Sequence, residues 1–166
     1  MTSQISKVAE RVIATLFVPQ LISTGAFGRN QFAYMPERGA RDALAQLVLT
    51  WIRLFGRKRK VGVYCSDVSG AFDKVNSQRL LRKLRARGVP DQILGVIESW
   101  LSERKARVAV GGKFSRGMQI NNMVYQGTVL GPPLWNVFYA NAAGPVNVHN
   151  FLEVIFADDL KLIQGF

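Results

Sequence analysis

The sequence is poor in the side chains that build several common kinds of site. It contains one cysteine, Cys65, and one histidine, His149. A single cysteine excludes an internal disulfide framework and a zinc site made of cysteines. A single histidine excludes a histidine cluster for a metal, and it excludes a Ser–His catalytic arrangement unless His149 is itself the base. Cys65 stands in an apolar run, so we expect it in the core.

Long apolar runs and acidic side chains are also scarce. No apolar run reaches the roughly 18 residues that a membrane span needs, and residues 12–22 are interrupted by Thr15, Pro19 and Gln20. We therefore predict no membrane span, and we recognise no targeting signal. There are 11 Asp and Glu against 22 Lys and Arg, a net charge of +11. This excess predicts a polyanionic partner, either nucleic acid or an anionic membrane surface; generic basicity spread along the chain is the alternative.

The 166 residues, 48% of them hydrophobic, are enough for a core and for one domain or a piece of a larger one. Hydrophobic periodicity and turn residues predict the elements. Helices are expected at 3–17, 41–54, 77–87, 90–101 and 133–142, the third capped by Ser77. Strands are expected at 61–68, 104–110, 113–120 and on both sides of a turn within 151–163. One stripe of the second helix, with the spacing of ordinary core packing, holds Leu44, Leu47, Val48 and Trp51.

Two adjacent carboxylates, Asp158 and Asp159, stand at the turn of the last strand pair. Adjacent anions repel each other unless a cation lies between them, and carboxylate oxygens suit Mg²⁺. Taken alone, such a pair is more often a solvated turn. However, Asp67 ends the predicted strand 61–68, and the three carboxylates converge if these strands are neighbours. Such a cluster can hold two Mg²⁺ ions and carry out an in-line phosphoryl transfer.

Two further segments have features that suit phosphate. Residues 69–73 turn from the strand that ends at Asp67 into a helix, and backbone N–H groups in such a turn form an anion site. The run Arg57-Lys58-Arg59-Lys60 precedes the same strand. A short charge run of this kind is typical of a solvated loop, and contact with the phosphates of a nucleic acid is the alternative.

Three segments come in the order and spacing of polymerase motifs A, B and C. They are residues 67–75 (DVSGAFDKV), 126–132 (QGTVLGP) and 156–159 (FADD). Residues 31–44 resemble the fingers segment ahead of motif A, and residues 107–112 resemble the hairpin ahead of motif B. Together they are similar to the reverse transcriptases of non-LTR (LINE-type) retrotransposons, and the resemblance covers nearly the whole chain.

The resemblance implies a role for each motif residue. Asp67, Asp158 and Asp159 match the catalytic acids, which with Val68 hold two Mg²⁺ ions, or Mn²⁺ in their place. Phe72 matches the residue that stacks under the incoming sugar and excludes a ribose 2′-hydroxyl; a core aromatic is the alternative reading of its ring. The implied dNTP-binding residues are Val68, Ser69, Gly70, Ala71, Phe72, Gln126 and Gly127.

The resemblance also implies the fold. We expect an α+β right-hand polymerase palm, an antiparallel sheet backed by helices, at residues 61–166 with all three motifs. Residues 1–60 are expected to form partial helical fingers. The thumb is expected to be absent, because the chain stops seven residues after Asp159.

The function implied is that of an RNA-directed DNA polymerase that adds dNTPs to a primer 3′-hydroxyl. Its partners would be an RNA template, a DNA primer and dNTPs, with no membrane and no inferable protein partner, in either the nucleus or the cytoplasm. The alternative is a catalytically inactive, truncated remnant that binds nucleic acid through its basic surface. An RNA-directed RNA polymerase is a third reading, and Phe72 argues against it.

Overall fold

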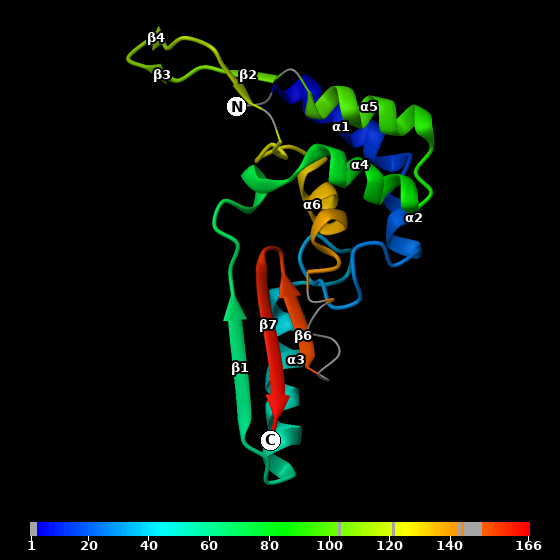
Figure 1. Ribbon diagram of the computed structural model, residues 1–166, viewed down its shortest axis with the longest axis vertical. Helices are drawn as coiled ribbons and strands as arrows, with labels where there is room; N and C mark the ends of the chain where they lie inside the picture. The colour runs from blue at the N-terminus through cyan, green and yellow to red at the C-terminus, as the bar shows by residue number, and fades with distance from the viewer. Residues whose placement is uncertain (1–2, 103, 121, 143, 145–150) are drawn as a thin grey trace.

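The computed structural model describes residues 3–102, 104–120, 122–142, 144 and 151–166, so His149, the open case of a Ser–His base, lies outside the described residues. Three parts are visible in Figure 1: a group of helices, a sheet with one helix behind it, and a projecting hairpin. The helices are α1 (Gln4–Thr15), α2 (Val18–Ser23), α3 (Ala40–Gly56), the 3₁₀ helix η1 (Ala71–Lys74), α4 (Ser77–Ala86), α5 (Asp91–Leu101) and α6 (Gly131–Tyr139). The strands are β1 (Val61–Ser66), β2 (Arg104–Ala106), β3 (Ala109–Val110), β4 (Lys113–Phe114), β5 (Met118–Ile120), β6 (Leu152–Phe156) and β7 (Asp159–Gly165).

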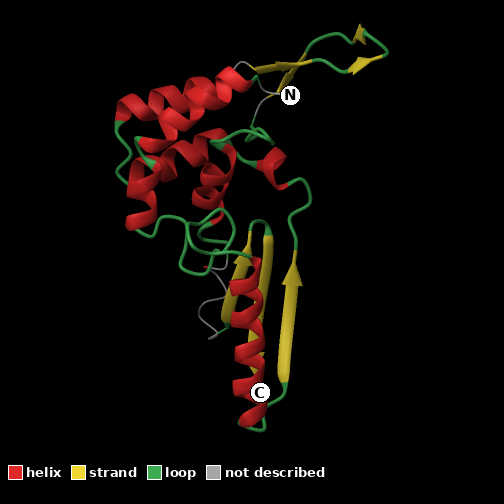
Figure 2. Cartoon of the chain, turned by 180° about the vertical axis from the view of Figure 1, so that it is seen from behind, coloured by secondary structure: helices red, strands yellow, loops and turns green. Residues whose placement is uncertain are grey.

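The main sheet has the order β1-β7-β6, and both of its strand pairs are antiparallel. Helix α3 runs along one face of this sheet (Figure 2). There Ala43 and Leu47 of α3 pack against Val154 of β6 and Ile163 of β7. Because side chains alternate along a strand, Ile155 of β6 points to the other face, where it joins a second apolar cluster. An antiparallel sheet backed by helices confirms the predicted α+β class.

The remaining helices form the larger core of the molecule. Helices α4, α5 and α6 pack together with α1 and α2 around Trp135 of α6, which is 1% exposed. Other large side chains buried in this core are Phe17, Leu21, Phe27, Leu80, Leu84, Ile97, Leu130 and Leu134. The core thus combines residues from the N-terminal helices with residues of α4, α5 and α6, the helix that precedes the β6–β7 pair.

The predicted hairpin closed at Gly111-Gly112 is confirmed. Strands β2 and β5 pair antiparallel, as do β3 and β4 farther out. The two glycines between β3 and β4 have φ values of +55° and +76°. Both lie in the left-handed region that a tight hairpin turn requires and that glycine adopts without strain. The hairpin projects away from the helices (Figure 1).

Several local predictions are wrong. Cys65, expected in the core, is exposed on the edge strand β1. Leu44 is 59% exposed although its neighbour Leu47 is buried. The cap of α4 is Asn76, whose side chain accepts a 2.9 Å hydrogen bond from the Arg79 N–H. Helix α2 was not predicted. Within the described part of the chain, none of the helices combines the length and hydropathy of a membrane span.

Candidate active site

The sheet register places the predicted catalytic acids at one end of the main sheet. Ser66, the last residue of β1, pairs with Leu160 of β7. Asp67 and Asp159 are therefore each the next residue beyond that pair, and Asp158 occupies the adjoining β6–β7 turn. Asp67 and Asp159 are exposed, whereas Asp158 is half-buried. Acids that are far apart in the sequence thus come to the same end of the sheet, as predicted.

The phenol of Tyr139, at the end of α6, interacts electrostatically with these acids. Burial raises the pKa of Tyr139, and the negative charges of Asp158, Glu153, Asp67 and Asp159 raise it further. Because the Coulomb energy falls with distance, all four carboxylates must lie near enough to the Tyr139 hydroxyl to change its pKa. Nevertheless, among the described residues no three His, Cys, Asp or Glu side chains are grouped closely enough to hold a metal ion. The acids share a region, but they do not form a preassembled metal site.

A cleft at this end of the sheet brings the three motif segments together. It is bounded by the turn that follows β1, by the loop that precedes α6 and by the β6–β7 turn. Its lining residues are Tyr34, Gly70, Ala71, Phe72, Asp73, Gln126 and Asp158. Four of the predicted dNTP-binding residues therefore face the same cleft as one of the predicted catalytic acids, Asp158. The other predicted residues, Asp67, Val68, Ser69, Gly127 and Asp159, do not line it.

The β6–β7 turn that carries Asp158 is held by a buried side-chain amide. Gln31, 1% exposed, accepts a 3.0 Å hydrogen bond from the Ala157 N–H and donates a 3.2 Å bond to the Ala157 carbonyl. The indole N–H of Trp135 donates a 3.0 Å bond to the same carbonyl. Ala157 has a φ of +57°, an unfavourable conformation for a residue with a side chain. These three bonds hold the turn in that conformation.

Phe72 contacts both the apolar core and the cleft. Its ring stacks on Trp135 at a centroid distance of 5.7 Å and an interplanar angle of 21°, and it also lines the cleft. Trp135 in turn stacks on Tyr139 at 4.9 Å. A row of three aromatic rings thus joins the turn after β1 to the region of the acids. Phe72 is half-buried, so a core contact and a cleft contact are both present.

The chain turns sharply at two glycines in the loops beside the cleft. Gly70 has a φ of +63° and Gly127 a φ of +78°, both in the left-handed region. A side chain at either position would strain the turn. Gln126, next to Gly127, is exposed and lines the cleft. The predicted nucleotide loops therefore have the tight turns that their glycines indicate.

The basic run Arg57-Lys58-Arg59-Lys60 lies at the other end of the sheet. It precedes Val61, which pairs with Gly165 at the end of β1 opposite to Asp67. Six strand residues separate the run from Asp67, a span of about 20 Å. All four side chains are exposed, and the Arg59 guanidinium donates a 2.7 Å bond to the Gly165 carbonyl. The structure does not bring this run to the cleft.

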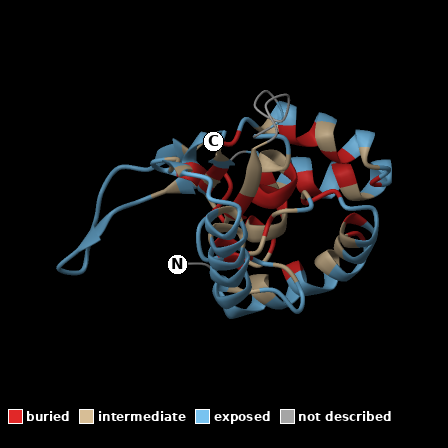
Figure 3. Ribbon diagram, turned by 90° about the horizontal axis from the view of Figure 1, so that it is seen from below, coloured by how far each residue is buried: buried red, intermediate tan, exposed pale blue. Residues whose placement is uncertain are grey.

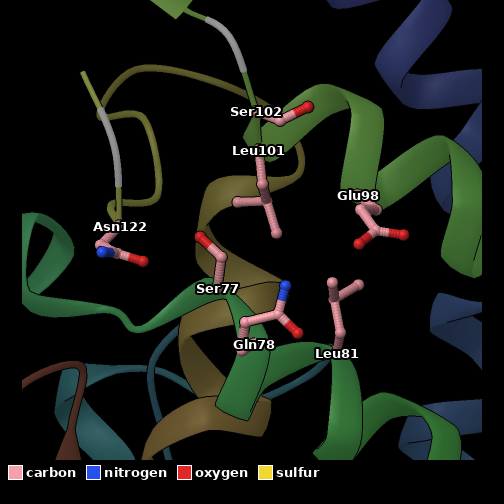
Figure 4. Close-up of a pocket in the computed structure, with 7 residues that line it drawn as sticks. All are labelled: Ser77, Gln78, Leu81, Glu98, Leu101, Ser102 and Asn122. Atoms are coloured by element: carbon pink, nitrogen blue, oxygen red, sulfur yellow. The ribbon is translucent and has the colours of Figure 1, made fainter. Parts of the chain in front are cut away.

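A separate hollow lies between α4 and α5 (Figure 4). Ser77 and Gln78 of α4 line one side, and Glu98 of α5 lies across from them. Among the described residues that line it, none belongs to the predicted catalytic or nucleotide-binding sets, and Glu98 alone carries a carboxylate. It is therefore not a part of the candidate active site.

Sequence reasoning missed Gln31, Trp135 and Glu153 as residues of this site. Gln31 stands beside aromatic residues in segment 31–34. These neighbours are the one feature of the sequence that could have indicated that Gln31 is buried. Glu153 lies on β6, and burial raises its pKa while a hydrogen bond with Asn30 opposes the shift. Gln31 begins the segment that resembles the fingers, but that resemblance does not indicate its bonds to Ala157, and no motif includes Glu153. Both roles arise from contacts between distant segments.

Residues 1–164 match the family described as Reverse transcriptase (RNA-dependent DNA polymerase). The chain is 27% identical over 170 residues to a probable RNA-directed DNA polymerase from transposon BS of Drosophila melanogaster, covering 99% of this chain and 19% of that protein. It is 30% identical over 165 residues to the RNA-directed DNA polymerase from mobile element jockey of the same species, covering 96% and 18%.

A third relative is the Pol polyprotein from the type-1 retrotransposable element R2 of Popillia japonica. The two are 29% identical over 134 residues, which cover 73% of this chain and 22% of that protein. The chain thus spans about a fifth of the length of these curated relatives. All three relatives are proteins of mobile elements.

Solved structures with the same fold include telomerase from Candida tropicalis. A complex with the TWJ fragment of telomeric RNA matches with a TM-score of 0.69 at 13% identity, over 98% of this chain and 29% of that one. An apo form truncated from the C-terminal domain matches with a TM-score of 0.68 at 14% identity, over 96% and 34%. These likenesses confirm the predicted palm-like α+β fold.

Proposed function

Because the chain belongs to the reverse transcriptase family, of non-LTR retrotransposon origin, we propose that it is the catalytic core of an RNA-directed DNA polymerase. It would extend a primer 3′-hydroxyl with dNTPs on an RNA template. The observation that carries this proposal is the cleft in which Gly70, Phe72, Gln126 and Asp158 come together from three segments. Residues 61–166 would form the palm, and residues 1–60 would form part of the fingers.

The acids at the end of the sheet would hold the divalent ions that reverse transcriptases generally use. Asp67 and Asp158 would be the main ligands, with Asp159 and the Val68 carbonyl beside them. Two Mg²⁺ ions, or Mn²⁺, would supply a nucleophilic primer oxygen and would stabilise the pyrophosphate leaving group. The acids do not converge in the described residues, so their oxygens would have to move together when the ions, each with a double positive charge, enter.

The chain's own residues would position the nucleotide. The backbone N–H groups of Ser69, Gly70 and Ala71 would contact the triphosphate as an anion site. The Phe72 ring, fixed from behind by its stack on Trp135, would lie under the sugar and exclude a 2′-hydroxyl. Gln126, which lines the cleft, and the adjacent Gly127 would support the nucleotide and the template base.

Primer extension on an RNA template in Mg²⁺ tests this proposal. We expect dNTP incorporation by the wild-type chain and by Asp91→Asn, which removes an exposed acid far from the cleft. We expect none from Asp158→Asn, because the neutral amide is a poor ligand for Mg²⁺. Extension by Asp158→Asn at the wild-type rate would exclude Asp158 from the reaction.

The alternative function, a remnant that binds nucleic acid without catalysis, is favoured by the lack of a preassembled metal site in the described residues. It predicts retention of nucleic acid that is unaffected by Mg²⁺ and by Asp158→Asn, with no extension by any variant. The same set of proteins therefore separates the two functions.

A further inference from the structure

We propose that the hairpin of residues 104–120, called the arm below, is a docking surface for a single strand of nucleic acid that continues from the cleft. The arm projects from the helices as β2, β3, β4 and β5 (Figure 1). Its assignment rests on the proposed function only for the direction of the strand, which would run between the arm and the cleft. The binding itself does not depend on catalysis.

The charge of the arm is of one sign. Its cationic side chains are Arg104, Lys105, Arg107, Lys113 and Arg116, and residues 104–120 contain no Asp or Glu. All of them except Arg104 are exposed. In the view of Figure 3, the arm is exposed over most of its length. Five positive charges on a thin projection attract a polyanion and cannot be neutralised by acids of the arm itself.

Exposed apolar side chains accompany these charges. Phe114 is 70% exposed and Val110, beside the turn, is 73% exposed, while Val108 is 54% exposed. A phenyl ring in water beside cations is the combination on which unpaired bases stack while their phosphates are held. Bases within a duplex have no free face for such a ring. This combination favours a single strand over a duplex.

The hollow at the base of the arm shares a lining residue with the candidate active site. A hollow there is lined by residues that include Arg104, Arg107, Tyr125 and Gln126. Gln126 also lines the cleft that contains Asp158, so one side chain borders both spaces. A strand that leaves the cleft past Gln126 would meet the cations of the arm next.

Arg104 is the fixed point of this path. Its guanidinium lies 5.4 Å from the ring centroid of Trp100 and 4.8 Å from that of Tyr125. These two cation–π contacts hold the charge at the mouth of the hollow. The outer cations have no such contacts in the described structure and are free to follow a backbone.

The test compares two sets of substitutions that remove equal charge. Arg107→Gln/Lys113→Gln/Arg116→Gln removes three exposed cations of the arm. Arg57→Gln/Lys58→Gln/Lys60→Gln removes three from the basic run and leaves Arg59, whose side chain bonds the Gly165 carbonyl. The measurement is fluorescence anisotropy with a labelled single-stranded RNA of about 12 nucleotides, and with DNA of the same sequence. Neither Mg²⁺ nor dNTPs are present.

We expect the arm triple to bind both the RNA and the DNA strand roughly tenfold to a hundredfold more weakly. The slope of log K against log salt concentration should become shallower by about two, because each lost phosphate contact removes about 0.7 from that slope on single strands. The basic-run triple should remain within about threefold of wild type, since its cations are some 20 Å from the cleft. Equal losses in the two triples would overturn the proposal, because they would show generic attraction by net charge.

A second pair of variants tests the stacking and does not change charge. Phe114→Ala should weaken single-strand binding by about tenfold with the salt slope unchanged. Phe55→Ala, which removes a 60% exposed ring from the outer side of α3, should leave it unchanged. Equal effects of the two variants, or tighter binding to a blunt duplex than to the single strand, would refute the arm as a single-strand surface. A chain without polymerase activity can still pass this test, and an active polymerase can fail it.

Discussion

The carboxylate of Glu10, in α1, accepts a 2.6 Å hydrogen bond from the backbone N–H of Val129, 119 residues away. The same oxygen accepts a 3.2 Å bond from the Leu130 N–H, and the other accepts a 3.3 Å bond from the indole of Trp100. Glu10 is 3% exposed, and α6 has no side-chain cap of its own. A buried carboxylate therefore completes the N-terminus of α6, where negative charge is stabilising, and positions the loop that carries Gln126.

Glu10→Ala is expected to lower the free energy of unfolding by roughly 2–4 kcal/mol, because it leaves two backbone N–H groups and one indole N–H without their acceptor. Urea denaturation measures the loss. Glu10→Gln should lose less, since its amide oxygen can still accept from Val129 and Leu130. Glu98→Ala, at an exposed position on α5, is the control and should change stability by less than about 0.5 kcal/mol. A loss at Glu98 equal to that at Glu10 would contradict the capping role.

Gln31→Ala is expected to destabilise the protein by roughly 2–4 kcal/mol and to slow primer extension by up to a hundredfold. The stability loss follows from the Ala157 and Ala33 N–H groups, which lose their acceptor in a buried place, while the Ala157 carbonyl keeps only its bond from Trp135. The rate loss follows from displacement of the adjacent Asp158, since small misplacements of reacting groups are costly. Stability is read from urea denaturation and the rate from saturating-dNTP extension at a temperature where both proteins are folded.

Gln46→Ala is the matched control for this prediction. Gln46 is an exposed glutamine on α3, so the substitution deletes the same side-chain atoms at an exposed position instead of a buried one. It should leave both the unfolding free energy and the extension rate close to wild type. If Gln31→Ala were folded and as fast as Gln46→Ala, the bonds to Ala157 would have no part in positioning Asp158.

Tyr139 should report the entry of a divalent ion among the acids. Burial raises its pKa and four carboxylates raise it further, so a cation that neutralises the carboxylates should lower the pKa again. Ultraviolet titration of the tyrosines with and without Ca²⁺ measures this effect; Ca²⁺ takes oxygen ligands as Mg²⁺ does and stays soluble at alkaline pH. The Ca²⁺-dependent shift should disappear in Tyr139→Phe and shrink in Asp158→Asn. An identical shift in Tyr139→Phe would place the ion elsewhere.

Glu153 should make stability depend on pH in weakly acidic solution. Burial raises its pKa above the ordinary 4.5, so between that value and its value in the folded state the native protein binds more protons than the unfolded chain. Stability therefore falls as pH rises through this window. Glu153→Gln removes the titration, so its stability relative to wild type should increase with pH and then level off. Urea midpoints across the window measure this, and a constant difference would contradict it.

Local sequence determined the elements that depend on a few neighbouring residues. The turn between β3 and β4 was predictable because two consecutive glycines supply the two positive φ angles that it needs. The β6–β7 pair was predictable from alternation around Asp158, although Asp159 belongs to β7 rather than to the turn. The motif residues indicated a family because their types and spacing encode backbone geometry and charge together.

Only the tertiary structure decided which of these side chains meet, and which are exposed. Cys65 and Leu44 are exposed because no other element covers them in the described structure. No local sequence pattern carries that information. The sequence placed acids at strand ends, but the register of β1 on β7 decided that Asp67 and Asp159 share one end of the sheet. Gln31 acquires its role from Ala157, 126 residues away. Backbone preferences act over a few residues, whereas burial and hydrogen-bond pairing are set by whichever distant segments the whole fold brings together.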